Sequence, residues 1–368
     1  MRVLIAPDKF KGSMTAREAA ETIQDALGHD WSATCLPIAD GGEGTAEALT
    51  DALAGEWIRC SARDPLGRVV ESGYGLVPGP PKTAIIEMSH ASGLWRLNPD
   101  ELDPWVASTF GTGELIRNAV EKGAERILLG LGGSATNDGG SGMAKALGVR
   151  FLNDQGEDVE EIPRDLLQVR RIDVSNRLEL PEFSAACDVS NPLLGSEGAT
   201  RVYGPQKGVK ESQLANHEER LEHLANLVGG DFREIPGSGA AGGLGFGCLA
   251  FCGATLEPGF ELVADLLNLR AEIQKADLVI TGEGSLDAQT LQGKGPHGVA
   301  LLARELGKPV LAVAGRTDGA PRLEEEFDRV IVISPTEIPV AEAMERGGEF
   351  LRQAIALAEP WMRDQIPG

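Results

Sequence analysis

The stretch Arg2–Leu27, RVLIAPDKFKGSMTAREAAETIQDAL, contains the structural unit from which the fold can be inferred. Its aliphatic beginning, Arg2–Ala6, predicts a buried strand, and the polar residues after it predict a loop. Apolar residues at helical spacing then predict an amphipathic helix over Ala16–Leu27, with Thr15 and Glu18 spaced as a capping box at its start. A strand, a loop and a helix in this order are typical of α/β proteins with a parallel sheet.

The same order recurs toward both ends of the chain. A strand is expected at Ala33–Ile38, followed by a helix at Thr45–Leu53. Three more strands are expected near the C-terminus, at Leu278–Thr281, Val310–Ala314 and Val330–Ile333. Uniformly apolar strands are typical of sheets that are covered on both faces. The two ends of the chain therefore predict one doubly wound domain with a parallel sheet.

The middle of the chain has a different pattern, in which expected strands are separated by longer polar loops. These strands are Val69–Val77, Thr83–Met88, Arg126–Gly130, Val149–Leu152 and Phe183–Cys187. The tetrapeptide PGPP at Pro78–Pro81 predicts a hairpin-like turn between the first two. We expect two domains: a discontinuous doubly wound domain of residues 1–58 and 262–368, and an inserted mixed α/β domain of residues 59–261.

The composition excludes several classes of function. A formal net charge of -22 argues against nucleic-acid and anionic-membrane partners, which are bound through a surplus of lysine and arginine. The five cysteines form neither a Cys-x-x-Cys pair nor a zinc spacing, which indicates reduced thiols. No apolar run reaches the roughly 20 residues of a membrane helix, and Asp8 interrupts the N-terminal run too early for a signal peptide. We therefore expect a soluble, cytoplasmic protein.

Charged residues follow the expected strands of the terminal domain, at the edge where open parallel sheets bind ligands. They are Asp8, Lys9 and Lys11 after the first strand, Asp40 after the second, Glu283 and Asp287 after the third, and Arg316 after the fourth. Carboxylates near helix starts also interact favourably with helix dipoles, but that explanation leaves the lysines unused. Lysines suit phosphate oxygens, whereas carboxylates suit Mg²⁺ or an attacking hydroxyl. The combination predicts phosphoryl transfer.

The glycine-rich segment Gly130–Asp138, GLGGSATND, formally matches the dinucleotide fingerprint with alanine in the last place. Asn137 and Asp138, however, stand where a pyrophosphate would meet bare helix N–H groups, so a magnesium nucleotide suits the segment better than NAD. The segment around Lys294, LQGKGP, lacks the residues of a Walker A motif. A second glycine cluster, Gly237–Gly243, predicts either a phosphate-binding nest or close packing between segments. Asp188, after an expected strand, is a candidate base or a turn former.

Six motifs resemble those of the bacterial glycerate kinase family, type I group. They are APDKFKGSMTA (6–16), PIADGGEGT (37–45), GLGGSATNDGG (130–140), CDVSNPLLG (187–195), YGPQKG (203–208) and TGEGSLDAQTLQGKGPHGVA (281–300). The resemblance extends from residue 1 to about residue 350. It implies ATP-dependent, Mg²⁺-requiring phosphorylation of D-glycerate by an enzyme with a discontinuous flavodoxin-like domain, an inserted α/β domain and a cleft between them.

Each candidate residue has an expected role in this reaction, assigned from its chemistry and its position after an expected strand. The catalytic candidates are Asp8, Lys9, Asp188 and Lys294, with Asp8 and Asp188 as rivals for orienting the substrate hydroxyl. The substrate-binding candidates are Lys11, Ser13, Asp40 and Lys207, and the nucleotide-binding candidates are Gly132, Gly133, Ser134, Asn137 and Glu283. Asp138 and Asp287 are the expected Mg²⁺ ligands.

Two questions stay open at the level of the sequence. The resemblance favours 2-phosphoglycerate as the product, with 3-phosphoglycerate as the alternative, because no motif reports which hydroxyl faces the phosphate. Two other classes are an NAD-dependent hydroxyacid dehydrogenase, suggested by Gly130–Ala135, and a non-catalytic sensor of small acids. The abundance of lysines and carboxylates disfavours the sensor. The oligomeric state has no signature in the sequence.

Overall fold

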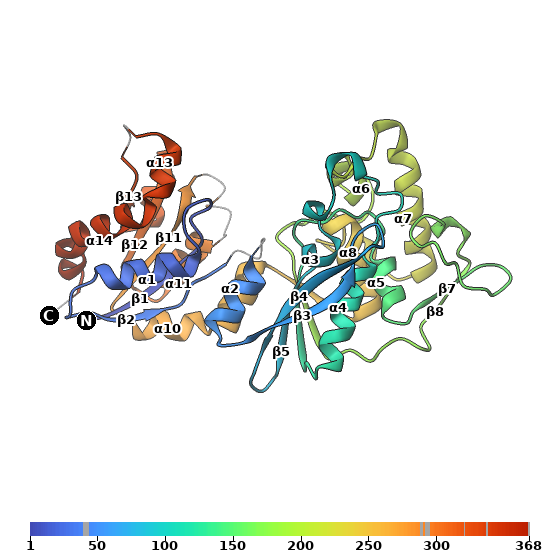
Figure 1. Cartoon of the computed structure of the whole chain (residues 1–368), viewed down its shortest axis with the longest axis horizontal. Helices are drawn as coiled ribbons and strands as arrows, with labels where there is room; N and C mark the ends of the chain where they lie inside the picture. Colours follow the sequence, from blue (N-terminus) through green and yellow to red (C-terminus); the bar gives the residue numbers. More distant parts are fainter. Residues whose placement is uncertain (40–43, 288–289, 291–294, 320, 336–337, 367–368) are drawn as a thin grey trace. The chain divides into compact units, whose positions relative to one another are not determined.

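The chain divides into two units in the computed structural model, which describes residues 1–39, 44–287, 290, 295–319, 321–335 and 338–366. The first unit combines Met1–Asp40 with Phe260–Gly368, and the second is Gly41–Gly259. Figure 1 shows the blue N-terminal and the orange-to-red C-terminal segments together in the first unit. The expected domain of residues 1–58 included helix α2 (Thr45–Ala52). In the structure α2 belongs to the second unit, because it packs against that unit's strands.

The first unit contains a five-stranded parallel sheet in the order β13-β12-β11-β1-β2. Its strands are β1 (Arg2–Pro7), β2 (Ser32–Cys35), β11 (Leu278–Leu286), β12 (Val310–Thr317) and β13 (Arg329–Val332). Strands β11 and β12 begin where expected but continue further, because Ser285 pairs with Arg316 and Leu286 with Thr317. The segment from Glu283 to Leu286 is therefore strand, and its prediction as a loop was wrong.

Helices cover both faces of this sheet. They are α1 (Ala16–Ala26), α9 (Gly259–Leu266), α10 (Leu269–Lys275), α11 (Gly295–Glu305), α12 (Pro321–Glu326), α13 (Val340–Glu345) and α14 (Gly347–Asp364). The predicted capping box of α1 is confirmed: the Glu18 N–H donates to Thr15 Oγ1 at 3.1 Å, and the Thr15 N–H donates to Glu18 Oε2 at 2.8 Å. Helices α1 and α14 pack together over one face of the sheet and share a core with β1, β11 and β12.

The second unit contains a mixed six-stranded sheet in the order β10-β9-β6-β5-β4-β3. Its strands are β3 (Glu56–Arg63), β4 (Val69–Val77), β5 (Thr83–Glu87), β6 (Arg126–Gly130), β9 (Glu182–Ala186) and β10 (Thr255–Glu257), and β7 (Arg150–Leu152) pairs separately with β8 (Arg171–Asp173). The expected hairpin at PGPP is confirmed by the antiparallel pairing of β4 with β5. Strands β5, β6, β9 and β10 are parallel, so their carboxyl ends share one edge.

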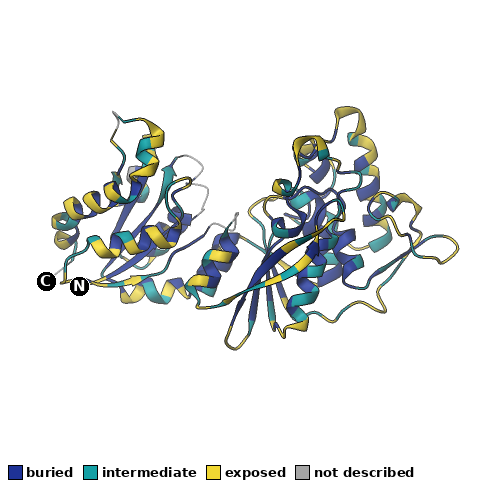
Figure 2. Ribbon diagram, in the orientation of Figure 1, coloured by how far each residue is buried: buried dark blue, intermediate teal, exposed yellow. Residues whose placement is uncertain are grey.

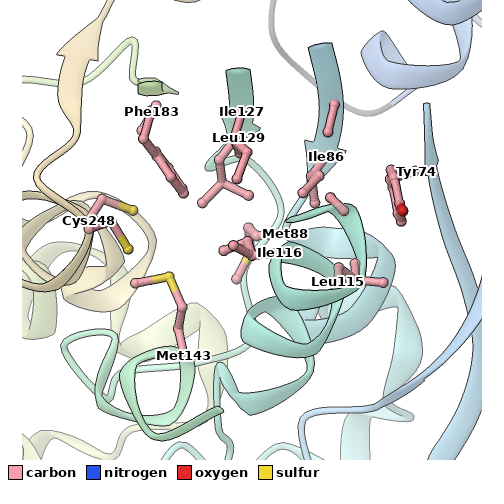
Figure 3. Packing of buried hydrophobic residues seen from close by; sticks show 14 of the residues in the cluster. Tyr74, Ile86, Met88, Leu115, Ile116, Ile127, Leu129, Met143, Phe183 and Cys248 are labelled. Carbon is pink, nitrogen blue, oxygen red and sulfur yellow. The ribbon is translucent and has the colours of Figure 1, made fainter. Parts of the chain in front are cut away.

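The helices of the second unit pack on this sheet or on one another and build two core clusters. Besides α2 they are α3 (Ser89–Ser92), α4 (Phe110–Glu121), α5 (Ser141–Ala146), α6 (Ala199–Tyr203), α7 (Leu214–Val228) and α8 (Ala240–Gly247). Figure 3 shows Ile86, Ile127, Leu129 and Phe183 of three strands beside Leu115, Ile116 and Met143 of α4 and α5. Figure 2 shows that each unit buries its own strands and exposes the outer sides of its helices. No described helix combines the length and the hydropathy that a membrane span requires.

Candidate active site

The carboxyl end of β1 holds a buried carboxylate. Asp8 is 6% exposed, and its N–H donates to the Gly282 carbonyl of β11 at 2.8 Å. Asp8 Oδ1 accepts the Lys9 N–H at 2.6 Å. Oδ2 lies at the start of α11, because a Cβ added at Gly295 would be 3.2 Å from it. The peptide dipoles at a helix N-terminus stabilise such a negative charge. Asp8 is thus held firmly in place, next to the half-buried Lys9.

Two half-buried carboxylates lie at the end of β11. Glu283 Oε1 accepts a hydrogen bond from Thr290 Oγ1 at 2.6 Å, and the Asp287 N–H donates to the same hydroxyl oxygen at 3.2 Å. Ser285, between them in sequence, donates to Asp287 Oδ2 at 3.4 Å and accepts from Arg316 Nε at 3.2 Å. Mg²⁺ is usually held through one or two carboxylates together with substrate phosphates. The pair therefore fits Mg²⁺, and Arg316 adds a cation at the same edge.

Ser13 has a structural contact, and its expected contact with substrate stays a prediction. Its hydroxyl donates to the Met344 carbonyl at 2.6 Å, and a Cβ added at Gly347 would lie 2.2 Å from the same oxygen. Lys11 is exposed, and the backbone around it lies over β11, because a Cβ added at Gly284 would be 3.0 Å from Lys11 N. The other two candidates predicted near this edge, Asp40 and Lys294, lie outside the described residues.

The glycine-rich segment after β6 is exposed only at its beginning. Gly132 and Gly133 are exposed, and Gly133 has a φ of 74°, a conformation that glycine adopts without strain. From Ser134 onward every residue to Asp138 is buried. Only the first part of the segment can therefore meet a ligand through its backbone N–H groups.

Asp138 does not have the surroundings of a metal ligand, so the prediction of Mg²⁺ binding for it was wrong. It is fully buried, with Oδ1 accepting from Gly140 N at 3.0 Å. Oδ2 accepts from Thr109 N at 2.9 Å, Thr109 Oγ1 at 2.8 Å and Gly142 N at 3.1 Å. Burial raises the pKa of Asp138, and the four donors oppose that rise. Because the carboxylate occupies the start of α5, it also blocks the place that a dinucleotide pyrophosphate would need.

Three buried side chains stabilise the glycine-rich segment after β6 from within, those of Lys207, Ser134 and Asn137. Lys207 is 1% exposed, and its Nζ donates to Ser134 Oγ at 2.6 Å and to the Thr136 carbonyl at 2.7 Å. Asn137 Nδ2 donates to Thr200 Oγ1 at 2.9 Å, whereas its buried Oδ1 has no hydrogen-bond partner among the described residues. The side chains expected to contact substrate or nucleotide are thus buried, and we correct their role to support of the segment.

The second glycine cluster packs against the same segment. Ala241, Gly242 and Gly243 all have positive φ, of 54°, 68° and 85°. A Cβ added at Gly242 would lie 1.9 Å from the Thr136 carbonyl oxygen, and Gly139 N donates to the Gly242 carbonyl at 3.1 Å. Of the two interpretations that the sequence left open, the structure therefore supports close packing between segments.

Asp188 lies at the carboxyl edge of the second unit's sheet and is exposed. In the parallel register Gly130 pairs with Ala186, and Leu131 N donates to the Ala186 carbonyl at 3.4 Å, so Asp188 follows β9 beside the glycine-rich segment. Its Oδ1 accepts the Gly259 N–H at 2.8 Å. Over the described part of the chain, no three His, Cys, Asp or Glu side chains are grouped to hold a metal ion.

The free energy of unfolding is expected to rise with pH from about pH 7 because of Lys207. Burial lowers the pKa of Lys207 from 10.5 to about 7 in the folded protein. At pH values between these two pKa values the unfolded chain binds more protons than the folded protein. A rise in pH therefore increases the free energy of unfolding, by at most about 1.4 kcal/mol per pH unit. Urea denaturation from about pH 7 to about pH 7.8, below the thiol pKa of about 8.5 in an unfolded chain, measures the slope.

Two variants complete this measurement. Lys207→Met is expected to lose the slope that wild type shows. Lys275→Met removes a lysine whose side chain is 62% exposed and is expected to keep it. Equal slopes for wild type and Lys207→Met would contradict the assignment.

Comparisons with known proteins agree on one family. The Glycerate kinase family matches residues 3–362. Glycerate kinase of Halalkalibacterium halodurans is 44% identical over 98% of each chain, and Glycerate 2-kinase of Escherichia coli K12 is 42% identical over 86% of this chain and 85% of that protein. A crystal structure from Salmonella typhimurium LT2, described as a candidate glycerate kinase 2, has a TM-score of 0.91 at 40% identity and covers 99% of this chain and 98% of that one.

These findings confirm the predicted α/β fold and the predicted class of enzyme, a phosphotransferase with an alcohol group as acceptor. The chain belongs to the glycerate kinase family.

Proposed function

We propose that the protein transfers the terminal phosphoryl group of ATP to the 2-hydroxyl of D-glycerate, giving 2-phosphoglycerate. The observation that carries the proposal is the family match over residues 3–362. The choice of the 2-hydroxyl rests on the Escherichia coli relative, whose name specifies a 2-kinase and which is 42% identical. We further propose that the enzyme acts in the cytoplasm, in agreement with its five free cysteines.

The edge of the first unit supplies groups that suit a magnesium nucleotide. We assign Glu283 and Asp287 to Mg²⁺, because both are half-buried carboxylates joined through Thr290. When bound, Mg²⁺ would neutralise charge on phosphate oxygens. Lys9 and Lys11 supply cations for phosphate or for the glycerate carboxylate, because neither is fully buried.

The edge of the second unit supplies a base and backbone donors. Asp188 is exposed, whereas its rival Asp8 is 6% exposed, so we assign Asp188 to orient the hydroxyl of glycerate. The exposed Gly132 and Gly133 offer backbone N–H groups for phosphate oxygens. For Asp40 and Lys294, which lie outside the described residues, we keep the proposed roles in substrate binding and charge neutralisation.

A coupled assay tests both parts of the proposal. The purified protein with MgATP and D-glycerate is expected to release ADP, and a reaction without D-glycerate controls for background ATP hydrolysis. Enolase, added without phosphoglycerate mutase, is expected to convert the product to phosphoenolpyruvate, because it acts on the 2-phosphate. ADP release without phosphoenolpyruvate would identify the 3-phosphate instead. Absence of D-glycerate-dependent ADP release would refute the proposed activity.

A further inference from the structure

Glu87, which is not among the predicted site residues, is a buried carboxylate at the carboxyl end of β5. It is 4% exposed. Its Oε1 accepts the Ala46 N–H at 2.7 Å, and its Oε2 accepts the Gly44 N–H at 3.2 Å and the Ser89 hydroxyl at 3.4 Å. Gly44 is the N-cap of α2 and Ala46 lies in its first turn, where backbone N–H groups have no partner within the helix. Glu87 therefore caps α2 from a different part of the chain.

The cap by Glu87 fixes the position of α2 as well as satisfying the N–H groups at its start. The residue at the N-cap of α2 is Gly44, which has no side chain to accept the free N–H groups. A local cap would satisfy those groups wherever the helix lay, whereas Glu87 ties them to the end of β5. The middle of α2 is tied as well, because a Cβ added at Gly75 of β4 would lie 1.6 Å from Thr50 Oγ1.

The segment Glu87–Ser89 also contacts the glycine-rich segment after β6. Glu87 pairs with Gly130 in the register of β5 and β6, and Met88 N donates to the Gly130 carbonyl at 3.0 Å. A Cβ added at Gly133 would lie 3.3 Å from the Cβ of Ser89. The three consecutive residues Glu87–Ser89 thus contact the end of one motif, at Gly44, and the beginning of another, at Gly130.

We propose that Glu87 is a positioning residue for phosphoryl transfer, which holds the start of α2 in a fixed relation to Gly130–Gly133. The inference rests on the proposed function. At 4% exposure Glu87 does not itself contact a substrate, so its effect passes through the backbone that it holds. Misplacement of catalytic groups by about 1 Å can cost about 10²-fold in rate.

The test compares Glu87→Ala and Glu87→Gln with a matched control. Glu125 Oε2 also accepts a backbone N–H, that of Lys82 at 2.9 Å, but at the opposite edge of β5 and β6, so Glu125→Gln is the control. The measurements are kcat and KM for D-glycerate and ATP, the thermal unfolding midpoint, and amide hydrogen exchange of Gly44–Ala46. Glu87→Gln keeps one acceptor and should remain folded if Glu87→Ala does not.

We expect kcat/KM to fall by about 10²-fold in Glu87→Ala. In Glu87→Gln a smaller fall is expected, with cooperative unfolding retained. Amide exchange of Gly44–Ala46 should be faster in both variants, and Glu125→Gln should match wild type.

Faster exchange with unchanged kinetics would overturn the positioning role and leave Glu87 as a helix cap. Unchanged exchange would overturn the anchor itself. A fall of kcat/KM in Glu125→Gln equal to that in the Glu87 variants would overturn the positioning role. A wild-type protein without glycerate kinase activity would refute the proposed function, and the exchange rates would still decide whether the anchor exists.

Discussion

Replacement of Asp138 by alanine is expected to lower the free energy of unfolding by about 3–5 kcal/mol, the usual cost of removing one partner from a buried set of charges. The substitution leaves the N–H groups of Thr109, Gly140 and Gly142 without their acceptor. It also removes the negative charge that opposes the loss of a proton from Lys207 and Arg220, both of which are 1% exposed. Urea denaturation measures the effect.

Two variants help to interpret that result. Asp138→Asn keeps the shape and one carbonyl acceptor, so a smaller loss is expected. Asp158→Ala removes a partly exposed carboxylate paired with Arg150 and should change the free energy of unfolding by no more than about 1 kcal/mol. An Asp138→Ala variant that unfolds like wild type but needs a higher Mg²⁺ concentration for activity would instead indicate a Mg²⁺ ligand. That outcome would reverse our correction of its role.

Asp188→Asn is expected to lower kcat by about 10²–10⁴-fold, because an amide cannot take a proton from the hydroxyl of glycerate. Asparagine has the same shape and keeps an oxygen that can accept the Gly259 N–H. The unfolding midpoint and the KM for ATP should therefore stay close to those of wild type. Steady-state kinetics with D-glycerate as the varied substrate provide the measurement.

Asp8→Asn separates the two rival carboxylates. Asp8 is buried at the start of α11, so its loss is expected to reduce stability more than turnover. If Asp8→Asn abolished turnover while Asp188→Asn turned over normally, the assignment of the base would have to be exchanged.

The sequence predicted the strands of the first unit well at their beginnings and poorly at their ends. Uniformly apolar runs identify buried strands, and β1, β11 and β12 begin where those runs begin. Gly282, Gly284 and Gly315 then interrupt the apolar pattern, although the backbone continues to pair. Glycine weakens the local signal of a strand but permits close approach between strands, which only the three-dimensional pairing reveals.

The assignment of α2 shows a second reason for error. Its sequence follows a strand of the first unit, and no feature of Thr45–Ala52 itself indicates another partner. Its position is decided by Glu87, which comes 41 residues after Ala46, and by Gly75, which comes about 25 residues after Thr50. Local patterns predict that a helix forms, whereas its packing depends on residues distant in sequence.

The candidate site was predictable in residue type but only partly in role. The sequence selected Asp8, Lys9, Glu283 and Asp287, which the structure places at one edge of the first sheet. It also selected Ser134, Asn137, Asp138 and Lys207, which are buried. Hydroxyls, amides, carboxylates and lysines serve equally in ligand binding and in buried polar networks, so burial has to distinguish them.

The pairing of β1 with β11 has a consequence for biosynthesis. Pro7 is paired with Gly282, so the first strand to leave the ribosome waits for a neighbour about 270 residues behind it. At roughly 5–20 residues per second, that delay is roughly 15–55 s. During it, Val3, Leu4 and Ile5 have only the short edge strand β2 to pair with, whereas the continuous stretch Gly41–Gly259 can already fold. Nascent chains halted before residue 278 should therefore show a protease-resistant middle, a cleavable N-terminus and a requirement for chaperones that shield apolar segments.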